Sequence, residues 1–243
     1  MIDSHDAKIG VIEGFYGRSW RWEDRWDYAG FFKEHGYRYY IYAPKGDPFL
    51  RRRWQEPWPA ATAEKIAALA HHYRKMGVLF GIGLSPYEIY LNYGTEAKRQ
   101  LAQKVEELNA MPYDCLCVLF DDMKGDISNL ARLQVDIVHQ LAASSVASTL
   151  ILCPTYYSYD PILTKVFGPM PEHYLDDLGR WLDPAIHLFW TGPHVISHEY
   201  PPSHLREVTE RLQRQPFLWD NRLANDGARQ SQFLHLRSPR RGA

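Results

Sequence analysis

Short apolar runs alternate with longer segments of helical periodicity along most of the chain. The short runs are rich in β-branched and aromatic residues, as β-strands are, whereas the segments between them repeat apolar residues every three or four positions, as amphipathic helices do. Strands are predicted at residues 8–17, 37–47, 78–86, 115–120, 149–160, 187–193 and 216–221, and helices at about 19–35, where Ser19 is the expected N-cap, 61–76, 95–110, 127–144, 173–182 and 201–214.

This alternation predicts the fold class. Parallel strands need a crossover connection, and a helix between successive strands provides one. Seven strand-containing units follow one another without a linker or a low-complexity segment, which favours an α/β barrel over an open sheet. The 243 residues are therefore expected to form a single barrel domain, from about residue 8 to 232, followed by a basic tail at 233–243.

The segment CLCVLFDDM, residues 115–123, carries the clearest chemical signal. The run from Cys115 to Phe120 contains no charged residue, which predicts a strand buried on both faces, and it ends in Asp121 and Asp122. Ligands bind at the carboxyl ends of strands in parallel α/β folds, so both acids are candidates for catalysis. Successive strand residues point to opposite faces, so the two carboxylates are expected to differ in role. The alternative is a pair that only caps the next helix.

Polar, aromatic and glycine residues also follow the other predicted strands. If all the strand ends meet at one rim, these residues surround a single opening, which is typical of a site for a sugar or another polyol. Each has a structural interpretation as well, because loop lysines are usually solvated and aromatic residues in strands usually fill the core. The rim set is Glu13, Gly14, Tyr16, Lys45, Asp121, Asp122, Tyr156, Tyr157, Trp190, Trp219, Asp220 and Asn221.

Composition narrows the functional classes. The 28 Lys and Arg residues balance 29 Asp and Glu residues, so a net charge of −1 favours neither nucleic acid nor an anionic membrane as a partner. An aromatic fraction of 14% suits the flat faces of sugars or bases. Cys115, Cys117 and Cys153 lie in apolar runs and are interpreted as reduced core thiols. With no apolar run long enough to span a membrane, the chain is expected to be cytoplasmic.

Two further motifs favour structural interpretations. His187, His194 and His198 have spacings of seven and four and suggest a metal, but they lack an acidic fourth partner and partly lie in a predicted loop. The basic run RRRW at 51–54 is interpreted as a solvated loop face in preference to a phosphate site.

Six segments together resemble one enzyme family. The blocks GVIEGFYGRSW (10–20), YIYAPKGD (40–47), VLFDDM (118–123), CPTYY (153–157), WTGPHVIS (190–197) and WDNRLAND (219–226) look like glycoside hydrolase family 84, the β-N-acetylglucosaminidases that include O-GlcNAcase. The blocks occur in the family's order over nearly the whole chain. The combination of EGFYG, YAPK and FDD is highly specific, whereas any one of them alone is a weak signal.

The resemblance implies a TIM-type (β/α)8 barrel and a retaining, substrate-assisted hydrolysis, in which the substrate's own 2-acetamido oxygen is the nucleophile. Asp121 matches the family's first aspartate, a carboxylate that orients the acetamido N–H and stabilises the positive charge as an oxazoline forms. Asp122 matches the second, which protonates the leaving oxygen and then activates water. Asp122 would need a raised pKa for this role. No metal or organic cofactor is implied.

The same block-by-block match implies the contacts to the sugar. The backbone carbonyl of Gly14 and the amine of Lys45 match groups that contact the 3-hydroxyl. Tyr157 matches the tyrosine that hydrogen-bonds around the acetamido pocket, and Cys153 and Trp219 match residues that line that pocket.

The remaining matched residues lie in the last two blocks. Asn221 matches a residue that holds the acetamido end or Asp121, and Asp226 matches one that takes the 4- and 6-hydroxyls. Val195 and Ile196 match positions beside the cleft for the leaving group, where a modified peptide would lie.

The chain departs from the family's pattern at its end. The family has an eighth strand and a following loop with an asparagine, whereas this chain ends in FLHLRSPRRGA, 233–243. We therefore expect a barrel that lacks part or all of the eighth unit and exposes strand edges. The tail, a domain swap or a second copy of the chain in a homo-oligomer could close the gap. Gly227 stands where some relatives have an aromatic residue.

Several functions remain open on these residues. The resemblance favours an enzyme that removes O-linked GlcNAc from Ser or Thr of proteins, with O-GlcNAc-modified proteins or GlcNAc glycosides as its partners. Hyaluronan cleavage and a broad exo-hexosaminidase activity are alternatives within the family. A non-catalytic GlcNAc-binding module and a phosphoryl-transfer or hydrolytic enzyme that uses the acidic pair with a divalent cation are alternatives from other classes.

Overall fold

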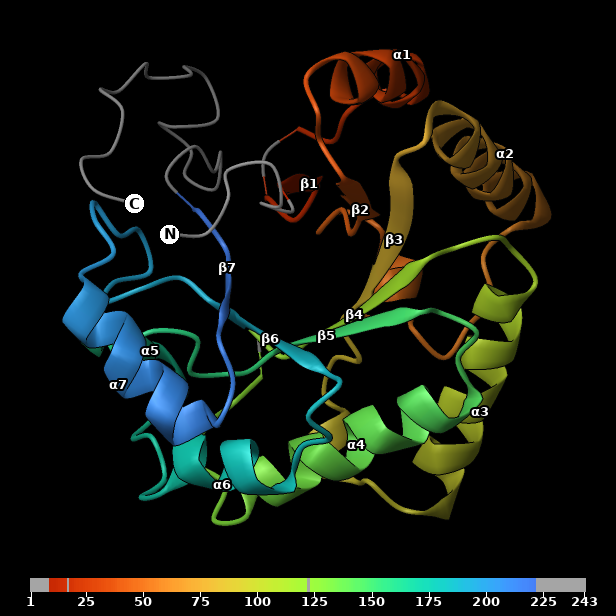
Figure 1. Cartoon of the computed structure of the whole chain (residues 1–243). Coiled ribbons are helices and arrows are strands. Elements are labelled where there is room, and N and C mark those ends of the chain that lie inside the picture. The colour runs from red at the N-terminus through yellow and green to blue at the C-terminus, as the bar shows by residue number, and fades with distance from the viewer. Residues whose placement is uncertain (1–8, 17, 122, 222–243) are drawn as a thin grey trace.

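The computed structural model describes residues 9–16, 18–121 and 123–221. Within these residues, seven parallel strands form one sheet, in which each strand pairs with the next one along the chain. The sheet curls into half a barrel, and helices lie around its outer side (Figure 1). The strands are β1 (Gly10–Ile12), β2 (Tyr39–Tyr42), β3 (Leu79–Leu84), β4 (Cys115–Leu119), β5 (Thr149–Cys153), β6 (His187–Trp190) and β7 (Phe217–Leu218).

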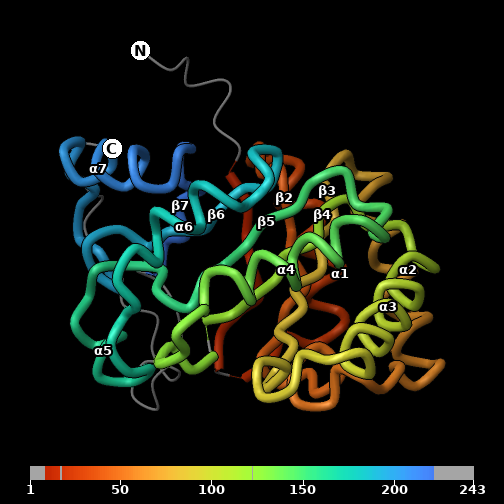
Figure 2. The backbone as a smooth tube through the Cα atoms, turned by 90° about the horizontal axis from the view of Figure 1, so that it is seen from below, coloured from red at the N-terminus to blue at the C-terminus, as the bar shows by residue number. Residues whose placement is uncertain are grey.

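The helices provide the crossover connections that parallel strands require. Seen at right angles to the first view, the chain passes around the sheet in sequence order and ends in blue at α7 and β7 (Figure 2). None of the helices in the described residues is both long and apolar enough to cross a membrane. The helices are α1 (Trp22–Glu34), α2 (Ala60–Met76), α3 (Thr95–Asn109), α4 (Leu130–Ser144), α5 (Pro161–Phe167), α6 (Tyr174–Trp181) and α7 (Pro202–Leu212), with short 3-10 helices η1 (Pro48–Leu50) and η2 (Ile89–Leu91).

The two faces of the strands pack into two separate clusters. In β4, Leu116 and Val118 belong to the large cluster between the sheet and the helices, whereas Cys115, Cys117 and Leu119 belong to a smaller cluster on the concave face. All five side chains are buried, which confirms the predicted strand with two buried faces. Side chains alternate between faces along a strand, so the odd-numbered residues of β4 point toward the concave face. Asp121 continues this odd-numbered set just after the strand.

Glycines on the concave face of β3 let its neighbours fill the barrel interior. A Cβ atom on Gly83 would lie 2.5 Å from the Cβ of Ala43 and 3.0 Å from Cδ1 of Leu119. On Gly81 it would lie 2.9 Å from Cγ1 of Ile41. A side chain at either position would therefore displace residues of β2 or β4, which explains why this apolar strand contains glycines.

The seven predicted strands and the predicted fold class are confirmed for the described residues, with the strands shorter than predicted at most ends. The start of the first helix was predicted wrongly. Ser19 does not cap it, because α1 begins at Trp22 and Arg21 occupies the N-cap position, where its backbone N–H donates to Asp24 Oδ2 at 3.1 Å. The Asp24 carboxylate also accepts from Arg21 Nε at 3.0 Å and Nη2 at 2.7 Å, so the acid three positions later satisfies the N-cap N–H and favours this helix start.

The helix α5 was not predicted. Its signal is the Asp160–Pro161 pair, since Asp160 is the N-cap and its Oδ1 accepts from the Ile162 N–H at 3.0 Å. Proline at the first helical position is favourable because its φ is already near the helical value. The same Asp–Pro signal begins η1 at Pro48, directly before the basic run at 51–54.

Candidate active site

The strands are parallel, so their carboxyl ends meet at one end of the half-barrel, which is called the rim here. The alternation of side chains decides which residues at the rim face the concave interior. Ile12, Leu119 and Phe189 pack in the concave cluster, so side chains an even number of positions along the same strand also point toward the concave face. The side chains between them point toward the helices. The predicted rim set therefore separates into two groups.

Lys45 and Asp121 form an ion pair at the concave side of the rim. The Lys45 Nζ lies 2.5 Å from Asp121 Oδ2, and the two side chains are 4% and 15% exposed. The other carboxylate oxygen, Oδ1, is buried and has no hydrogen-bond partner among the described residues. A buried carboxylate oxygen needs a donor, so this atom is placed to accept from an N–H of a ligand. The Lys45 amine also lies 5.4 Å from the centre of the Tyr16 ring.

Aromatic rings and a thiol line the interior below this pair. Trp219 packs against Phe189, with ring centres 4.9 Å apart, and a Cβ atom on Gly14 would lie 3.2 Å from the Trp219 ring. The absence of a side chain at Gly14 thus lets β1 and the end of β7 approach each other. Cys153 and Tyr157 contact the same concave cluster. Trp219, Cys153 and Tyr157 thus belong to or contact the concave cluster, which also contains Ala43 and Leu119, two residues before Lys45 and Asp121.

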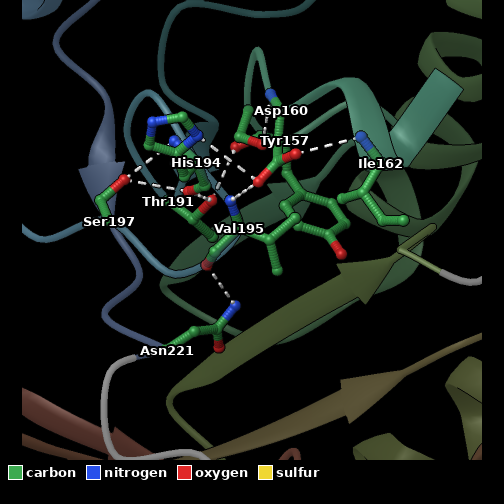
Figure 3. Close-up of polar contacts among 9 residues, drawn as sticks. Tyr157, Asp160, Ile162, Thr191, His194, Val195, Ser197 and Asn221 are labelled. Carbon is green, nitrogen blue, oxygen red and sulfur yellow. Dashed lines mark hydrogen bonds and ion pairs between the residues drawn. The ribbon is translucent and has the colours of Figure 1, made fainter.

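Asn221 holds the loop that follows β6. Its Nδ2 donates to the carbonyl of Val195 at 3.2 Å, and the Val195 N–H donates to Asp160 Oδ2 at 3.1 Å (Figure 3). His194 Nδ1 lies 3.6 Å from the same Asp160 oxygen. Side chains from the ends of β5 and β7 therefore fix both backbone groups of Val195. Ile196, the next residue, is 38% exposed.

Three members of the predicted rim set do not point toward the concave face of the sheet. Glu13 is fully buried and forms a bidentate ion pair with Arg25 of α1, at 2.7 and 2.8 Å, and also accepts from the Tyr40 hydroxyl. Trp190 is fully buried toward α7, where its Nε1–H donates to His204 Nε2 at 2.9 Å. Both residues follow the outward series of their strands, so they stabilise the contact between sheet and helices.

Tyr156 is the third of these residues. Its hydroxyl donates to the carbonyl of Gly168 at 2.7 Å, and burial, with a smaller contribution from the charge of Asp126, raises the pKa of Tyr156 to about 12. Asp220, which was also in the rim set, is exposed. Asp122 and Asp226 lie outside the described residues.

Asp47 supports the loop that carries Lys45, and the sequence interpretation missed it. Its Oδ2 accepts from the Tyr42 hydroxyl at 3.0 Å and from Trp58 Nε1 at 2.9 Å, and its Oδ1 accepts from the Phe49 N–H at 2.9 Å. These bonds tie the end of β2 to η1 and to the stretch before α2. The Asp–Pro pair was a signal for a turn, but nothing local indicated the contact with Trp58.

The other sequence motifs do not form separate sites in the described residues. No three His, Cys, Asp or Glu side chains of these residues are grouped to hold a metal ion, so the histidine motif at 187–198 has no support as a metal site. In the basic run, Arg53 pairs with Glu56, and the Arg51 guanidinium lies over the rings of Tyr16 and Tyr87.

The three cysteines are buried free thiols, as predicted. The Sγ atoms of Cys115 and Cys117 lie 3.8 Å apart. Burial, and then the neighbouring Cys115 thiol, raise the pKa of Cys117 well above its ordinary value, so this thiol stays protonated and is a packing group.

Comparison with known proteins supports one family. A sequence profile of the family described as beta-N-acetylglucosaminidase matches residues 9–241. The protein O-GlcNAcases of Rattus norvegicus and Mus musculus are each 31% identical over 235 residues, which cover 93% of this chain and 25% of each relative. The chain thus spans about a quarter of the length of these curated relatives.

The fold of this chain is also similar to that of a solved O-GlcNAc hydrolase. An O-GlcNAc hydrolase of Thermobaculum terrenum, solved as an aspartate-to-asparagine mutant, superposes with a TM-score of 0.81 and 33% sequence identity. The match covers 92% of this chain and 49% of that chain. On the match to its sequence profile, the chain belongs to the beta-N-acetylglucosaminidase family.

Proposed function

We propose that this protein is a retaining β-N-acetylglucosaminidase that removes O-linked GlcNAc from Ser or Thr residues of proteins. The observation that carries the proposal is the largely buried Lys45–Asp121 pair, which follows Ala43 and Leu119 of the concave cluster by two residues in a chain of this family. The names of the relatives, protein O-GlcNAcase and O-GlcNAc hydrolase, support the substrate class.

Asp121 acts on the acetamido group of the substrate. The ion pair with Lys45 fixes Oδ2, while the buried Oδ1 is available to accept from the acetamido N–H. This hydrogen bond turns the acetamido oxygen toward C1 of the sugar. As that oxygen attacks C1 and the glycosidic bond breaks, positive charge develops on the oxazoline ring and the nearby carboxylate stabilises it.

Asp122 is proposed as the general acid and base. Its proton passes to the glycosidic oxygen as the bond to C1 breaks, so the leaving hydroxyl departs neutral. The resulting carboxylate then takes a proton from water, which attacks C1, reopens the oxazoline and releases GlcNAc with its original configuration. The two adjacent acids thus have the separate roles that different environments permit.

The other matched residues are proposed to bind the sugar. The carbonyl of Gly14 and the amine of Lys45 contact the 3-hydroxyl, and Asp226 contacts the 4- and 6-hydroxyls. Tyr157, Cys153 and Trp219 surround the acetamido group, and their membership of, or contact with, the concave cluster supports this role. Asn221 acts through the Val195 loop to which it is bonded.

The setting of the protein is proposed on the same grounds. O-GlcNAc-modified proteins are its partners, and three buried free thiols are consistent with a cytoplasmic, reducing location. One continuous sheet across the described residues supports a single catalytic barrel domain.

The first test is hydrolysis of an aryl N-acetyl-β-glucosaminide by the parent and by the Asp121→Asn and Asp122→Ala variants. Activity in the parent and its loss in both variants would support the mechanism. A folded but inactive parent that still binds a GlcNAc-oxazoline mimic would identify a sugar-binding module instead. Activity that depends on a divalent cation and is abolished by a chelator would favour metal-assisted hydrolysis.

A second comparison separates the substrates. An O-GlcNAc peptide should be cleaved more efficiently than a hyaluronan oligosaccharide with a terminal GlcNAc, measured by kcat/KM on the same preparation. A preference for the oligosaccharide would favour the hyaluronidase alternative, and equal rates would favour a broad exo-hexosaminidase.

A further inference from the structure

Gln134 is a fully buried amide of α4 that lies behind the rim. Its Nε2 donates to Thr155 Oγ1 at 2.8 Å and contacts Met123 Sδ at 3.5 Å, and its Oε1 accepts from the Tyr174 hydroxyl at 2.5 Å. The amide is thus bonded to residues that follow β4 and β5 and to α6. A buried polar residue at an otherwise apolar helix–sheet contact is costly unless these bonds are made.

The network continues to the residues on either side of the acidic pair. Thr155 Oγ1 donates to the carbonyl of Phe120 at 3.1 Å, and the Met123 N–H donates to the same carbonyl at 3.0 Å. Phe120 directly precedes Asp121, and Met123 directly follows Asp122. Gln134 therefore contacts Met123 directly and reaches Phe120 through Thr155.

The same network reaches the segment of Tyr157. The Thr155 N–H donates to the Tyr174 hydroxyl at 3.1 Å, so both the backbone and the side chain of Thr155 are held. Thr155 lies two residues before Tyr157, the residue proposed to contact the acetamido group. One amide therefore sets the separation between the end of β4, with the acids, and the end of β5, with the tyrosine.

We infer that Gln134 is a positioning residue of the active site, an inference that rests on the proposed function. It does not touch the substrate. It fixes Phe120 and Met123, the residues that flank the acidic pair, relative to Tyr157 through Thr155 and Tyr174. Gln134 and Thr155 have no exposed surface, and Tyr174 and Met123 are only 1% and 5% exposed. Water thus cannot replace a lost bond without a rearrangement of the core.

Small displacements at this point are expected to matter for catalysis more than for binding. Oxazoline formation requires the acetamido oxygen, C1 and the catalytic carboxylates to be aligned, and a shift of about 1 Å in such a site can reduce a rate by about 100-fold. Gly14 and Lys45, which are proposed to contact the 3-hydroxyl, follow β1 and β2 and are not part of the network. Loss of Gln134 should therefore lower kcat and leave KM almost unchanged.

The test is Gln134→Met, which keeps the length of the side chain and removes its hydrogen bonds. Gln140→Met is the matched control, because Gln140 lies on the same helix and also accepts from a tyrosine, Tyr93, at 2.7 Å, but its Nε2 donates to the Lys98 carbonyl and not to a rim residue. With an aryl N-acetyl-β-glucosaminide, Gln134→Met should lower kcat by about 10- to 100-fold and change KM by less than about twofold. Gln140→Met should retain the parental kcat at a temperature below its unfolding midpoint.

A second pair of variants, at Thr155, tests the same network if Gln134→Met does not fold. Thr155→Val removes the hydroxyl that joins Gln134 to Phe120, whereas Thr155→Ser keeps it. Thr155→Val should lower kcat as Gln134→Met does, whereas Thr155→Ser should retain the parental kcat. A parent without activity would overturn the proposed function and this role with it. An active parent whose kcat is unchanged in the folded variants, or lowered equally by Gln140→Met, would overturn the positioning role alone.

Discussion

The Lys45 amine lies 2.5 Å from Asp121 Oδ2, although 76 residues separate the two in the chain. They follow β2 and β4, which are not neighbours, since β3 lies between them. The concave face of β3 carries Gly81 and Gly83, where a Cβ atom would meet side chains of β2 and β4. The glycine strand therefore brings the strands on its two sides close together, and the ion pair forms across its end.

Lys45→Met should remove most of the activity. The change removes the amine that fixes Asp121 Oδ2 and is proposed to contact the 3-hydroxyl, and a hydrogen bond to a charged group contributes about 1.5–3 kcal/mol. We expect kcat/KM for an aryl N-acetyl-β-glucosaminide to fall by at least about 10-fold, which corresponds to the lower of these values. Lys65→Met is the control, because the Lys65 amine lies on the outside of α2 over Trp22. Equal activity in the two variants would contradict a role for the ion pair.

Glu13→Gln should destabilise the fold. Glu13 and Arg25 are buried partners, and removal of one charge leaves the other uncompensated at a cost of about 3 kcal/mol. The free energy of unfolding, measured with a denaturant, should fall by about that amount. Glu96→Gln is the control, since the Glu96–Arg99 pair is exposed on α3 and such pairs contribute little. A variant with parental stability but no activity would instead indicate that Glu13 acts in the active site.

Asp160→Ala should weaken the cleavage of peptides more than that of small substrates. The change releases the Val195 N–H and the cap of α5, so the loop beside the proposed leaving-group cleft loses one of its two anchors. We expect kcat/KM for an O-GlcNAc peptide to fall several-fold further than kcat/KM for an aryl glycoside. Asp183→Ala, which removes a similar bond to the Ala185 N–H elsewhere, is the control. An equal loss for both substrates would argue against a role in peptide binding.

His204 should make the stability depend on pH. Burial, opposed by the charge of Glu207 and assisted by that of His194, lowers the pKa of His204 below 6.5, and its neutral ring accepts from the buried Trp190 indole. The unfolded chain then binds a proton at a higher pH than the folded protein does. The free energy of unfolding should therefore decrease as the pH falls below about 6.5. His204→Gln keeps an acceptor and should flatten this dependence in denaturant titrations between about pH 7.5 and 5.5. A parental slope in that variant would assign the pH dependence to other groups.

The sequence by itself was sufficient for the architecture and the family. Strands and helices differ in the period of their apolar residues, so their alternation predicts a parallel α/β barrel without knowledge of any contact. The six motif blocks predicted the family because several short, specific segments occur in one order. The sequence also singled out Asp121 and Asp122 as candidates because they directly follow the predicted strand 115–120, and Lys45 because it lies near the end of the predicted strand 37–47.

Only the tertiary structure decided which of the predicted rim residues point toward the concave face of the sheet and which hydrogen bonds hold them there. A shift of one residue in a strand reverses the face of every side chain, so the sequence could not tell that Glu13 and Trp190 point toward the helices while Trp219 faces inward. The partners Arg25, Gln134 and Asp160 come from other segments of the chain. Hydrogen bonds between distant segments leave no local pattern, because they depend on how the elements pack together.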